Sequence, residues 1–333
     1  MSQRPVKIGM MSFAHMHAGS YASSINSRAD TEMVGVADHD PDRTKAMAAQ
    51  FNTKAFGSYA ELLAEPGLDA VVVCSENIRH RELVEMAATA GKHILCEKPL
   101  ATTVADAEAM IAVCKAAGVQ LMTAFPCRYS AVMQRLKSTL ESGSSGKILA
   151  LRGTNRGRNP GGWFTEKALS GGGATIDHTV HVTDLMRWIL NDEVSEVYCE
   201  MSNGISHADF DDVGFLTMSF RNGVFATLDA SWSRPKSFPT WGDVTLEVLT
   251  TNGVFTMDMF SQNLVLYSDK ASGNTSWLNW GSNADDGLVG AFAHAISNNL
   301  PVPISGEDGL KAAQVAIAAY ASAASRLPVQ ISH

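Results

Sequence analysis

Short apolar segments alternate with segments of helical periodicity over roughly the first third of the chain. Runs of apolar residues predict buried strands. They recur at Val6–Met11, Met33–Ala37, Leu68–Cys74, His93–Cys96 and Gln120–Phe125. Strands joined by helices pair in parallel through right-handed crossovers. The pattern therefore predicts a doubly wound parallel sheet, which binds its ligand at the carboxyl ends of its strands.

Capping residues mark the ends of several of the predicted helices. Asp40 is a typical N-cap, and Pro41 follows at the first helical position, where its missing N–H costs nothing. Thr103 with Asp106 three residues later resembles a capping box. Gly118 is a typical C-terminal glycine. We therefore expect one helix from Pro41 and another from Thr103 to Gly118.

The pattern changes after Gly146, because most later strands follow one another without helices between them. Period-2 or apolar segments occur at 147–154, 194–201, 213–220, 224–231, 244–249, 254–259 and 264–267. Asn222-Gly223 and Asn252-Gly253 predict hairpin turns, since both residue types tolerate positive φ.

Three helices belong to this second part. An amphipathic helix is expected over Asp177–Leu190, and two more at 288–298 and 306–326 close the chain. The expected architecture is a parallel-sheet domain at 1–124 and an α/β domain with a large, open, mostly antiparallel sheet at 125–333. A chain of 333 residues is long enough for both.

Composition narrows the class of protein. The net charge of −8 argues against nucleic-acid binding as the main activity, and no apolar stretch is long enough to span a bilayer. Five cysteines without a C-x-x-C pair favour thiols in a reducing compartment, so we expect a soluble cytoplasmic protein. A charged fraction of only 18% hints at extra surface buried between subunits.

The turn after the first strand is the expected pyrophosphate site. Ser12-Phe13-Ala14-His15-Met16-His17 stands where a dinucleotide fingerprint would read G-x-G-x-x-G. Serine and alanine still allow close backbone approach, provided that their φ angles are negative, and the following helix N-terminus offers N–H groups. An ordinary turn is the alternative.

Asp38 ends the second strand at the distance expected for a carboxylate that binds the ribose hydroxyls. A carboxylate there repels a 2′-phosphate, so it favours NAD over NADP. The alternative is that Asp38 only supports the turn before Pro41.

Two further groups of residues carry candidate chemistry. Glu97-Lys98-Pro99 directly follows a buried strand, which directs the lysine into the ligand crevice; elsewhere such a pair is usually surface charge.

Asp177 and His181 are four apart on one predicted helix face, where a carboxylate raises the basicity of an imidazole. Gly171-Gly172-Gly173 precedes them and lets the backbone pass close to another group. The alternative is that Asp177 and His181 form an ordinary i,i+4 helix contact with no further role.

In this order, these pieces resemble the Gfo/Idh/MocA oxidoreductase family, which includes glucose–fructose oxidoreductase and inositol dehydrogenase. The most specific segments are Cys96–Ala101 and Gly171–His181, supported by Ser75–His80 and Phe125–Tyr129. The chain departs from the family pattern in its degraded glycine fingerprint and in Glu76, which replaces the usual proline.

The resemblance implies a Rossmann domain, a second domain with a large open sheet, and dimers or tetramers formed through that sheet. It implies that Lys98 is the active-site lysine, Asp177 its carboxylate partner and His181 the acid/base. The candidate cofactor-binding residues are Ser12, Phe13, Ala14, His15, Asp38, Ser75, Asn77, His80, Glu97 and Lys98. The candidate substrate-binding residues, chosen by position, are Arg128, Tyr129, Arg156, Trp163 and His178.

The expected function is hydride transfer between NAD, or less favourably NADP, and a secondary alcohol or ketone of a sugar, polyol or cyclitol, with no metal. Three alternatives stay open. One is an NAD-recycling glycoside hydrolase or lyase, and another is a non-catalytic sugar-sensing regulator. The third is a metal-dependent hydrolase that uses His15-x-His17 with His178 and His181.

Overall fold

The computed structural model describes residues 4–261, 263–267, 275–279 and 282–332. The chain forms two compact units. One consists of Met1–Pro126 with Ala284–Leu310, and the other of Cys127–Asn283 with Lys311–His333. The boundary expected between residues 124 and 125 lies close to the first junction. Residues 284–310, which the sequence analysis placed in the second domain, belong to the first unit.

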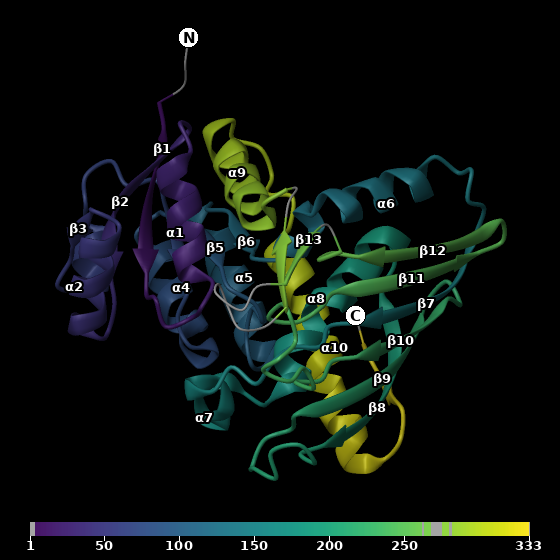
Figure 1. Ribbon diagram of the computed structural model, residues 1–333. Coiled ribbons are helices and arrows are strands. Elements are labelled where there is room, and N and C mark those ends of the chain that lie inside the picture. Colours follow the sequence, from purple (N-terminus) through teal and green to yellow (C-terminus); the bar gives the residue numbers. More distant parts are fainter. Residues whose placement is uncertain (1–3, 262, 268–274, 280–281, 333) are drawn as a thin grey trace. The chain divides into compact units, whose positions relative to one another are not determined.

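The first unit contains a six-stranded parallel sheet, as predicted (Figure 1). In sheet order the strands are β3 (Lys54–Ala55), β2 (Thr31–Ala37), β1 (Val6–Met11), β4 (Ala70–Val73), β5 (His93–Cys96) and β6 (Leu121–Thr123). The short edge strand β3 has no apolar signal of its own and was not predicted. The direction in which strands are added reverses between β1 and β4, so the ligand crevice of such a sheet lies at their carboxyl ends.

Helices cover this sheet. They are α1 (Ala18–Ser27), α2 (Pro41–Gln50), α3 (Tyr59–Leu63), α4 (His80–Thr89), which follows the 3₁₀ turn η1 (Asn77–Arg79), α5 (Val104–Ala117) and α9 (Ala284–Ser297). The predicted caps are confirmed. The Asp40 side chain accepts hydrogen bonds from the amides of residues 42 and 43. Thr103 accepts one from the amide of Asp106, and Gly118 has a φ of 68°.

Backbone pairing ties the late segment to the first sheet. The amide of Thr123 donates to the carbonyl of Ile304 at 3.0 Å, and Met122 forms a bridge with Ser305. The Thr123 hydroxyl donates to the Ser305 carbonyl. These bonds satisfy the open edge of β6, which explains why residues 284–310 belong to this unit.

The second unit is built on a seven-stranded sheet. In sheet order its strands are β12 (Gly253–Asp258), β11 (Thr245–Thr250), β7 (Ile148–Thr154), β10 (Phe225–Asp229), β9 (Val213–Phe220), β8 (Val194–Ser202) and β15 (Val329–Gln330). All pairs are antiparallel except β7 with β10, which confirms the prediction of a mostly antiparallel sheet. A separate hairpin joins β13 (Asn263–Tyr267) to β14 (Thr275–Asn279), and β14 was not predicted.

Both predicted hairpins form. Gly223 has a φ of 87° between β9 and β10, whereas neither Asn222 nor Asn252-Gly253 adopts a positive φ. The prediction of two hairpins is therefore confirmed, and only Gly223 uses the positive φ that these residue types tolerate.

Helices pack on one face of the second sheet (Figure 1). The helical elements are η2 (Pro126–Tyr129), α6 (Ala131–Glu141), η3 (Gly162–Thr165), α7 (Lys167–Ser170), α8 (Ala174–Leu190) and α10 (Gly306–Ser325). Val182, Met186 and Ile189 of α8 share a buried core with Leu216 and Leu246 of the sheet. α8 begins three residues earlier than predicted, so Asp177 lies within its first turn and not at its first residue.

Among the helices that the structure describes, none combines the length and the apolar character that crossing a lipid bilayer requires.

Candidate active site

The turn between β1 and α1 retains the backbone conformation of a glycine fingerprint without its first glycine. Ser12 has a φ of 75°, so the negative φ on which the expected close backbone approach depended is not met at this residue. The Ser12 hydroxyl donates to Asp38 Oδ2 at 2.9 Å and accepts from the amide of Ala14 at 3.1 Å. These two bonds stabilise a conformation that is unusual for serine.

The carboxylate of Asp38 is the centre of this turn and has no exposed side-chain surface. It accepts from the amide of Phe13 at 2.7 Å, and Arg43 of α2 binds it with two nitrogens at 2.8 and 2.7 Å. Burial alone would raise the pKa of Asp38, but the Arg43 hydrogen bond and the amide donors outweigh it and lower that pKa. Asp38 therefore stabilises the turn between β1 and α1 and holds the guanidinium of Arg43 beside it. The sequence analysis missed Arg43.

Replacing Asp38 by Ser should shift the cofactor preference towards NADP. The change removes the proposed ribose acceptor and releases Arg43, which can then pair with a 2′-phosphate. We expect the ratio of NAD to NADP affinity to fall by about tenfold or more, as loss of one charged hydrogen bond implies. Fluorescence titration with both cofactors measures this ratio. Asp42→Ser, whose side chain is 92% exposed on the same helix, is the control, and an unchanged ratio in Asp38→Ser would contradict the assignment.

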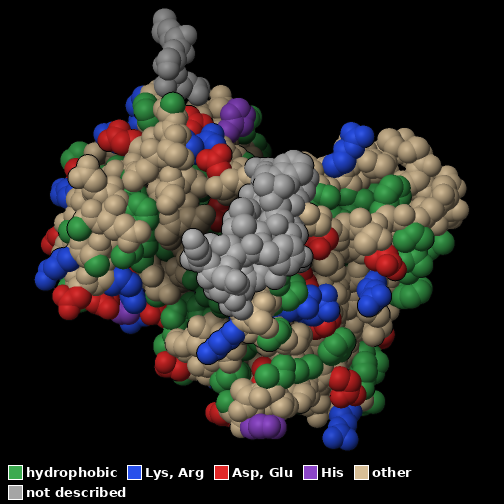
Figure 2. Space-filling model, viewed as in Figure 1, with side chains coloured by type: hydrophobic (Ala, Val, Ile, Leu, Met, Phe, Trp, Pro, Cys, Tyr) green, Lys and Arg blue, Asp and Glu red, His purple; other side chains and the backbone are tan. Residues whose placement is uncertain are grey.

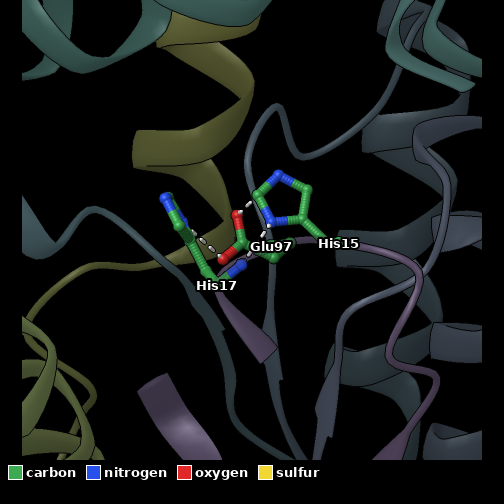
Figure 3. Close-up of side chains that lie close together, drawn as sticks. All are labelled: His15, His17 and Glu97. Carbon is green, nitrogen blue, oxygen red and sulfur yellow. Dashed lines mark hydrogen bonds and ion pairs between the residues drawn. The ribbon is translucent and has the colours of Figure 1, made fainter. Parts of the chain in front are cut away.

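A second cluster forms where β5 ends. The Glu97 carboxylate has no exposed surface and lies 3.2 Å from His17 Nδ1 and 3.8 Å from His15 Nε2 (Figure 3). Its Oε2 also accepts from the amide of Lys98 at 2.9 Å. The side chains of two sequence-distant segments thus meet at the carboxyl ends of β1 and β5, and Glu97 fixes the backbone of Lys98.

The charges of this cluster stabilise each other. Burial alone would raise the pKa of Glu97, but attraction to His15 and His17 and the His17 hydrogen bond hold it well below its usual range. Burial would lower the pKa of His17, but the neighbouring Glu97 charge and hydrogen bond raise it. The cluster therefore favours a carboxylate paired with an imidazolium.

His15, His17 and Glu97 also resemble a metal-ligand set, since their ligand atoms lie within 4.8 Å of one another. The tautomer of His15 disfavours that use. His15 Nδ1 accepts a hydrogen bond from the amide of His17 at 3.3 Å, which places the ring proton on Nε2, the nitrogen that faces Glu97. A metal would need the lone pair at that nitrogen. The donor pattern therefore fits two imidazoles that face one carboxylate better than a metal centre.

The His17–Glu97 pair should make stability depend on pH. Because the folded-state pKa of His17 is raised, its contribution is complete below the unfolded value near 6.5 and is lost as pH rises through the folded value. The melting temperature of the wild type should exceed that of His17→Gln by roughly 1–3 °C more at pH 6 than at pH 8.5. Differential scanning fluorimetry of both proteins across this range measures the difference. A constant difference would mean that the pair carries no charge.

Residues after β4 support the segment that contains Lys98. Burial lowers the pKa of His80, so its ring is neutral, and Nδ1 lies 3.0 Å from the carbonyl of Pro99 and 3.2 Å from that of Leu100. The Ser75 hydroxyl donates to the carbonyl of Glu76. Asn77 is 4% exposed beside them. His80 therefore braces the turn after Lys98, and direct contact of these three residues with the cofactor stays a prediction.

In the second unit, two of the three glycines before α8 allow the close approach that the sequence predicted, and the third, Gly171, has a φ of 84°. A Cβ on Gly172 would lie 2.1 Å from the hydroxyl of Tyr320, and one on Gly173 would lie 1.9 Å from the carbonyl oxygen of Asp211. The Asp211 carboxylate accepts from the amides of Gly173 at 2.9 Å and Thr175 at 2.8 Å. Asp211 thus caps α8 from a distant loop, which no local sequence signal indicates.

Asp177 lies in the first turn of α8, and its carboxylate is nearly buried. Its Oδ2 lies 3.2 Å from Nε2 of the adjacent His178 and accepts from the indole N–H of Trp232 at 3.2 Å. His181, one turn later, places Nδ1 3.9 Å from the thiol sulfur of Cys127. The predicted Asp177–His181 contact stays a prediction, and the sequence analysis did not find Trp232 or Cys127.

The two arginines proposed as substrate ligands have carboxylate partners within the protein. Arg128 binds Asp184 with two nitrogens at 2.7 and 2.5 Å, and Asp184 has no exposed side-chain surface. Arg156 donates from Nε to Asp243 at 2.9 Å. Both arginines therefore help to hold the fold around α8 and β11, and a direct role in substrate binding stays a prediction.

The aromatic residues proposed as substrate ligands are Tyr129 and Trp163. Burial raises the pKa of Tyr129 to about 12, so its phenol is neutral at physiological pH. Trp163 stacks on Phe164 with ring centroids 3.9 Å apart and is partly exposed. A role of either residue in substrate binding stays a prediction.

Both halves of the chain match models of one enzyme family. Residues 6–125 match the model of an oxidoreductase family with an NAD-binding Rossmann fold, and residues 133–256 match that of a GFO/IDH/MocA C-terminal domain.

Full-length relatives agree with these matches. Myo-inositol 2-dehydrogenase of Thermotoga maritima is 29% identical over 93% of this chain and 94% of its own. The 1,5-anhydro-D-fructose reductase of Ensifer adhaerens is 30% identical over 90% of this chain and 91% of its own. The crystal structure of a probable dehydrogenase from Thermotoga maritima superposes with a TM-score of 0.85 at 28% identity, covering 98% of both chains.

The chain belongs to the Gfo/Idh/MocA family of NAD-binding oxidoreductases. This confirms the resemblance seen in the sequence, and with it an enzyme that uses NAD. It also overturns the alternative of a metal-dependent hydrolase, whose (β/α)₈ barrel differs from the two sheets observed.

The residues of the first unit fit NAD. Ala14 in this turn is small, and the N-terminus of α1, which follows directly, offers N–H groups of the kind that bind a pyrophosphate. Asp38 is a carboxylate of the kind that binds ribose hydroxyls, but its side chain is buried against Arg43, and its contact with the ribose stays a prediction.

Proposed function

We propose that this protein transfers a hydride between NAD and a secondary alcohol or ketone on a sugar, polyol or cyclitol. The observation that carries the proposal is the position of Lys98, buried directly after β5 at the ligand edge of an NAD-binding sheet. The names of two relatives, an inositol dehydrogenase and an anhydrofructose reductase, support a ring polyol as the substrate class.

In this proposal the chain's own groups handle the proton while bound NAD exchanges the hydride. His181 takes the hydroxyl proton through Nε2, because Nδ1 faces Cys127. The Lys98 ammonium donates to the same substrate oxygen and stabilises the negative charge that develops there. Asp177 orients these groups. Lys98 lies in the first unit and the other two in the second, so their convergence is part of the proposal.

The proposed cofactor contacts follow the first sheet. Residues 12–15 and the N-terminus of α1 bind the pyrophosphate, and Asp38 binds the adenosine ribose and disfavours NADP. Ser75, Asn77, His80 and Glu97 line the nicotinamide side of the crevice. The substrate side is proposed to include Arg128, Tyr129, Arg156, Trp163 and His178.

A screen of NADH fluorescence against polyols, aldoses and cyclitols tests this function. Stoichiometric NADH formation with one member of the panel supports a dehydrogenase. Product formation without net NADH indicates an NAD-recycling hydrolase or lyase, and sugar binding without turnover indicates a regulator. Either of these two results would overturn the dehydrogenase proposal.

We also propose that the protein forms a homodimer or homotetramer through the face of its second sheet opposite the helices. Val254, Leu249 and Phe225 are exposed and lie in one row on β12, β11 and β10, with the small, buried Ala150 of β7 between Leu249 and Phe225. Figure 2 shows hydrophobic side chains scattered among charged ones on this part of the surface. Large exposed apolar side chains in a row are typical of an interface. Light scattering of wild type and Phe225→Glu tests it, since a monomeric wild type would contradict the proposal.

The proposed cellular location and partners rest on the state of the cysteines and on the net charge. Its five cysteines are buried thiols, which supports a cytoplasmic protein. The net charge of −8 supports a small-molecule substrate and no nucleic-acid partner.

A further inference from the structure

Trp232 follows strand β10, and packing and hydrogen bonds fix its position. Its side chain is 2% exposed and shares a small core with Phe164, Ala174 and Phe210. The rings of Phe210 and Trp232 lie 5.7 Å apart at an interplanar angle of 62°. The amide of Trp232 donates to the carbonyl of Asp212 at 2.8 Å. Because both backbone and ring are held, the direction of the indole N–H is fixed.

That N–H points to the carboxylate proposed to act in catalysis. Trp232 Nε1 lies 3.2 Å from Asp177 Oδ2, and His178 Nε2 lies 3.2 Å from the same oxygen. An indole nitrogen can only donate, whereas an imidazole nitrogen donates or accepts according to its tautomer. Of these two contacts, Trp232 is therefore the one that donates a hydrogen bond to Asp177 Oδ2 whatever the protonation state of His178.

The backbone of Asp177 is held by different groups. The amides at the start of α8 bind the carboxylate of Asp211, which is fixed in turn by the hydroxyl of Tyr320 at 2.7 Å. A fixed backbone still allows the Asp177 side chain to rotate. The indole N–H is placed to restrict that rotation, and catalytic groups lose much of their effect when their geometry loosens.

We propose that Trp232 is a positioning residue that orients the carboxylate of Asp177 for hydride transfer. The inference rests on the proposed function, in which Asp177 is a catalytic residue. Trp232 acts through Asp177 and not on substrate or cofactor. Its loss should therefore lower kcat and leave the KM for NAD unchanged.

A double-mutant cycle tests this inference with the panel compound that gives the highest yield of NADH. Trp232→Phe keeps an aromatic ring but removes the donor, and kcat should fall about tenfold, as the loss of one hydrogen bond to a charged group implies. The KM for NAD should stay within about twofold of wild type, since a residue that acts only on the reacting groups leaves cofactor binding alone. In the Asp177→Asn background, adding Trp232→Phe should cause no further loss, because the group it orients is gone. Independent, multiplying losses would overturn the proposal.

A second variant separates the hydrogen bond from packing. Incorporation of 3-benzothienylalanine at position 232 replaces the N–H by sulfur within a ring of nearly the same shape. We expect the same loss in kcat with an unchanged melting temperature, and wild-type kcat would overturn the proposal. Trp188→Phe, which removes an indole N–H near the other end of α8, is the matched control and should retain wild-type kcat.

The two proposals fail in different ways. Wild-type activity in Asp177→Asn would remove Asp177 from catalysis and, with it, the role of Trp232. An inactive Asp177→Asn together with a fully active Trp232→Phe would overturn the role of Trp232 alone.

Discussion

Replacing Lys98 by Met should lower kcat about 10²–10³-fold while NAD still binds, as measured losses of one donor to a developing oxyanion imply. Met retains much of the length and apolar volume of the lysine stem but cannot donate a hydrogen bond. The backbone amide of Lys98 still binds Glu97, since that bond does not involve the side chain. The supporting cluster of His15, His17 and Glu97 should therefore persist.

Steady-state kinetics and NAD titration separate the two parts of this expectation. Lys115→Met removes an exposed lysine on α5 of the same unit and is the control for charge loss alone. Near-wild-type kcat in Lys98→Met would exclude the lysine from the reaction. A parallel loss of NAD binding would instead assign it to the cofactor site.

Replacing His181 by Asn should lower kcat about 10²–10⁴-fold, the range typical of a lost general base. Asn retains a polar side chain of similar size, but it cannot accept a proton near neutral pH. The pH dependence should change as well: the rise of kcat/KM with pH that reports deprotonation of the base should disappear. Hydroxide can replace the base at high pH, so the loss should be smallest there.

The pH–rate profile from pH 5.5 to 10 and rescue by added imidazole measure this effect. His207→Asn is a suitable control, because His207 is exposed in the same unit and its φ of 55° suits asparagine. An unchanged profile in His181→Asn would assign proton transfer to another group. His178 would then be the first candidate, because it lies beside Asp177.

Local signals in the sequence were sufficient for most of the fold. Apolar runs located five of the six strands of the first sheet, and capping residues located helix starts to within a residue or two, as at Pro41 and Thr103. These signals succeed because a cap satisfies its own helix and a buried strand must be apolar along its length. The first turn of α8 was missed, because its cap, Asp211, comes from a loop 36 to 38 residues away from the amides that it binds.

The sequence also predicted some site residues but not their partners. Asp38 was recognised from its distance to the first strand, yet its pairing with Arg43 and Ser12 depends on how α2 and the turn pack together. Asp177 was recognised from its spacing to His181 and from the family segment that contains both, whereas Trp232 lies fifty-five positions later. Helical periodicity pointed to His181 as its neighbour; the structure places the adjacent His178 3.2 Å away.

By itself, the sequence determined the two sheets, their connection by helices, the family and the residue types that carry the chemistry. These features follow from periodicity, caps and short motifs, which act over a few residues. Only the tertiary structure decided that Arg43 binds Asp38, that His15 and His17 surround Glu97, and that Asp211 and Trp232 hold the start of α8. Such contacts join segments that are distant in the sequence. Each buried carboxylate requires hydrogen-bond donors, but this requirement does not specify which residue must supply them.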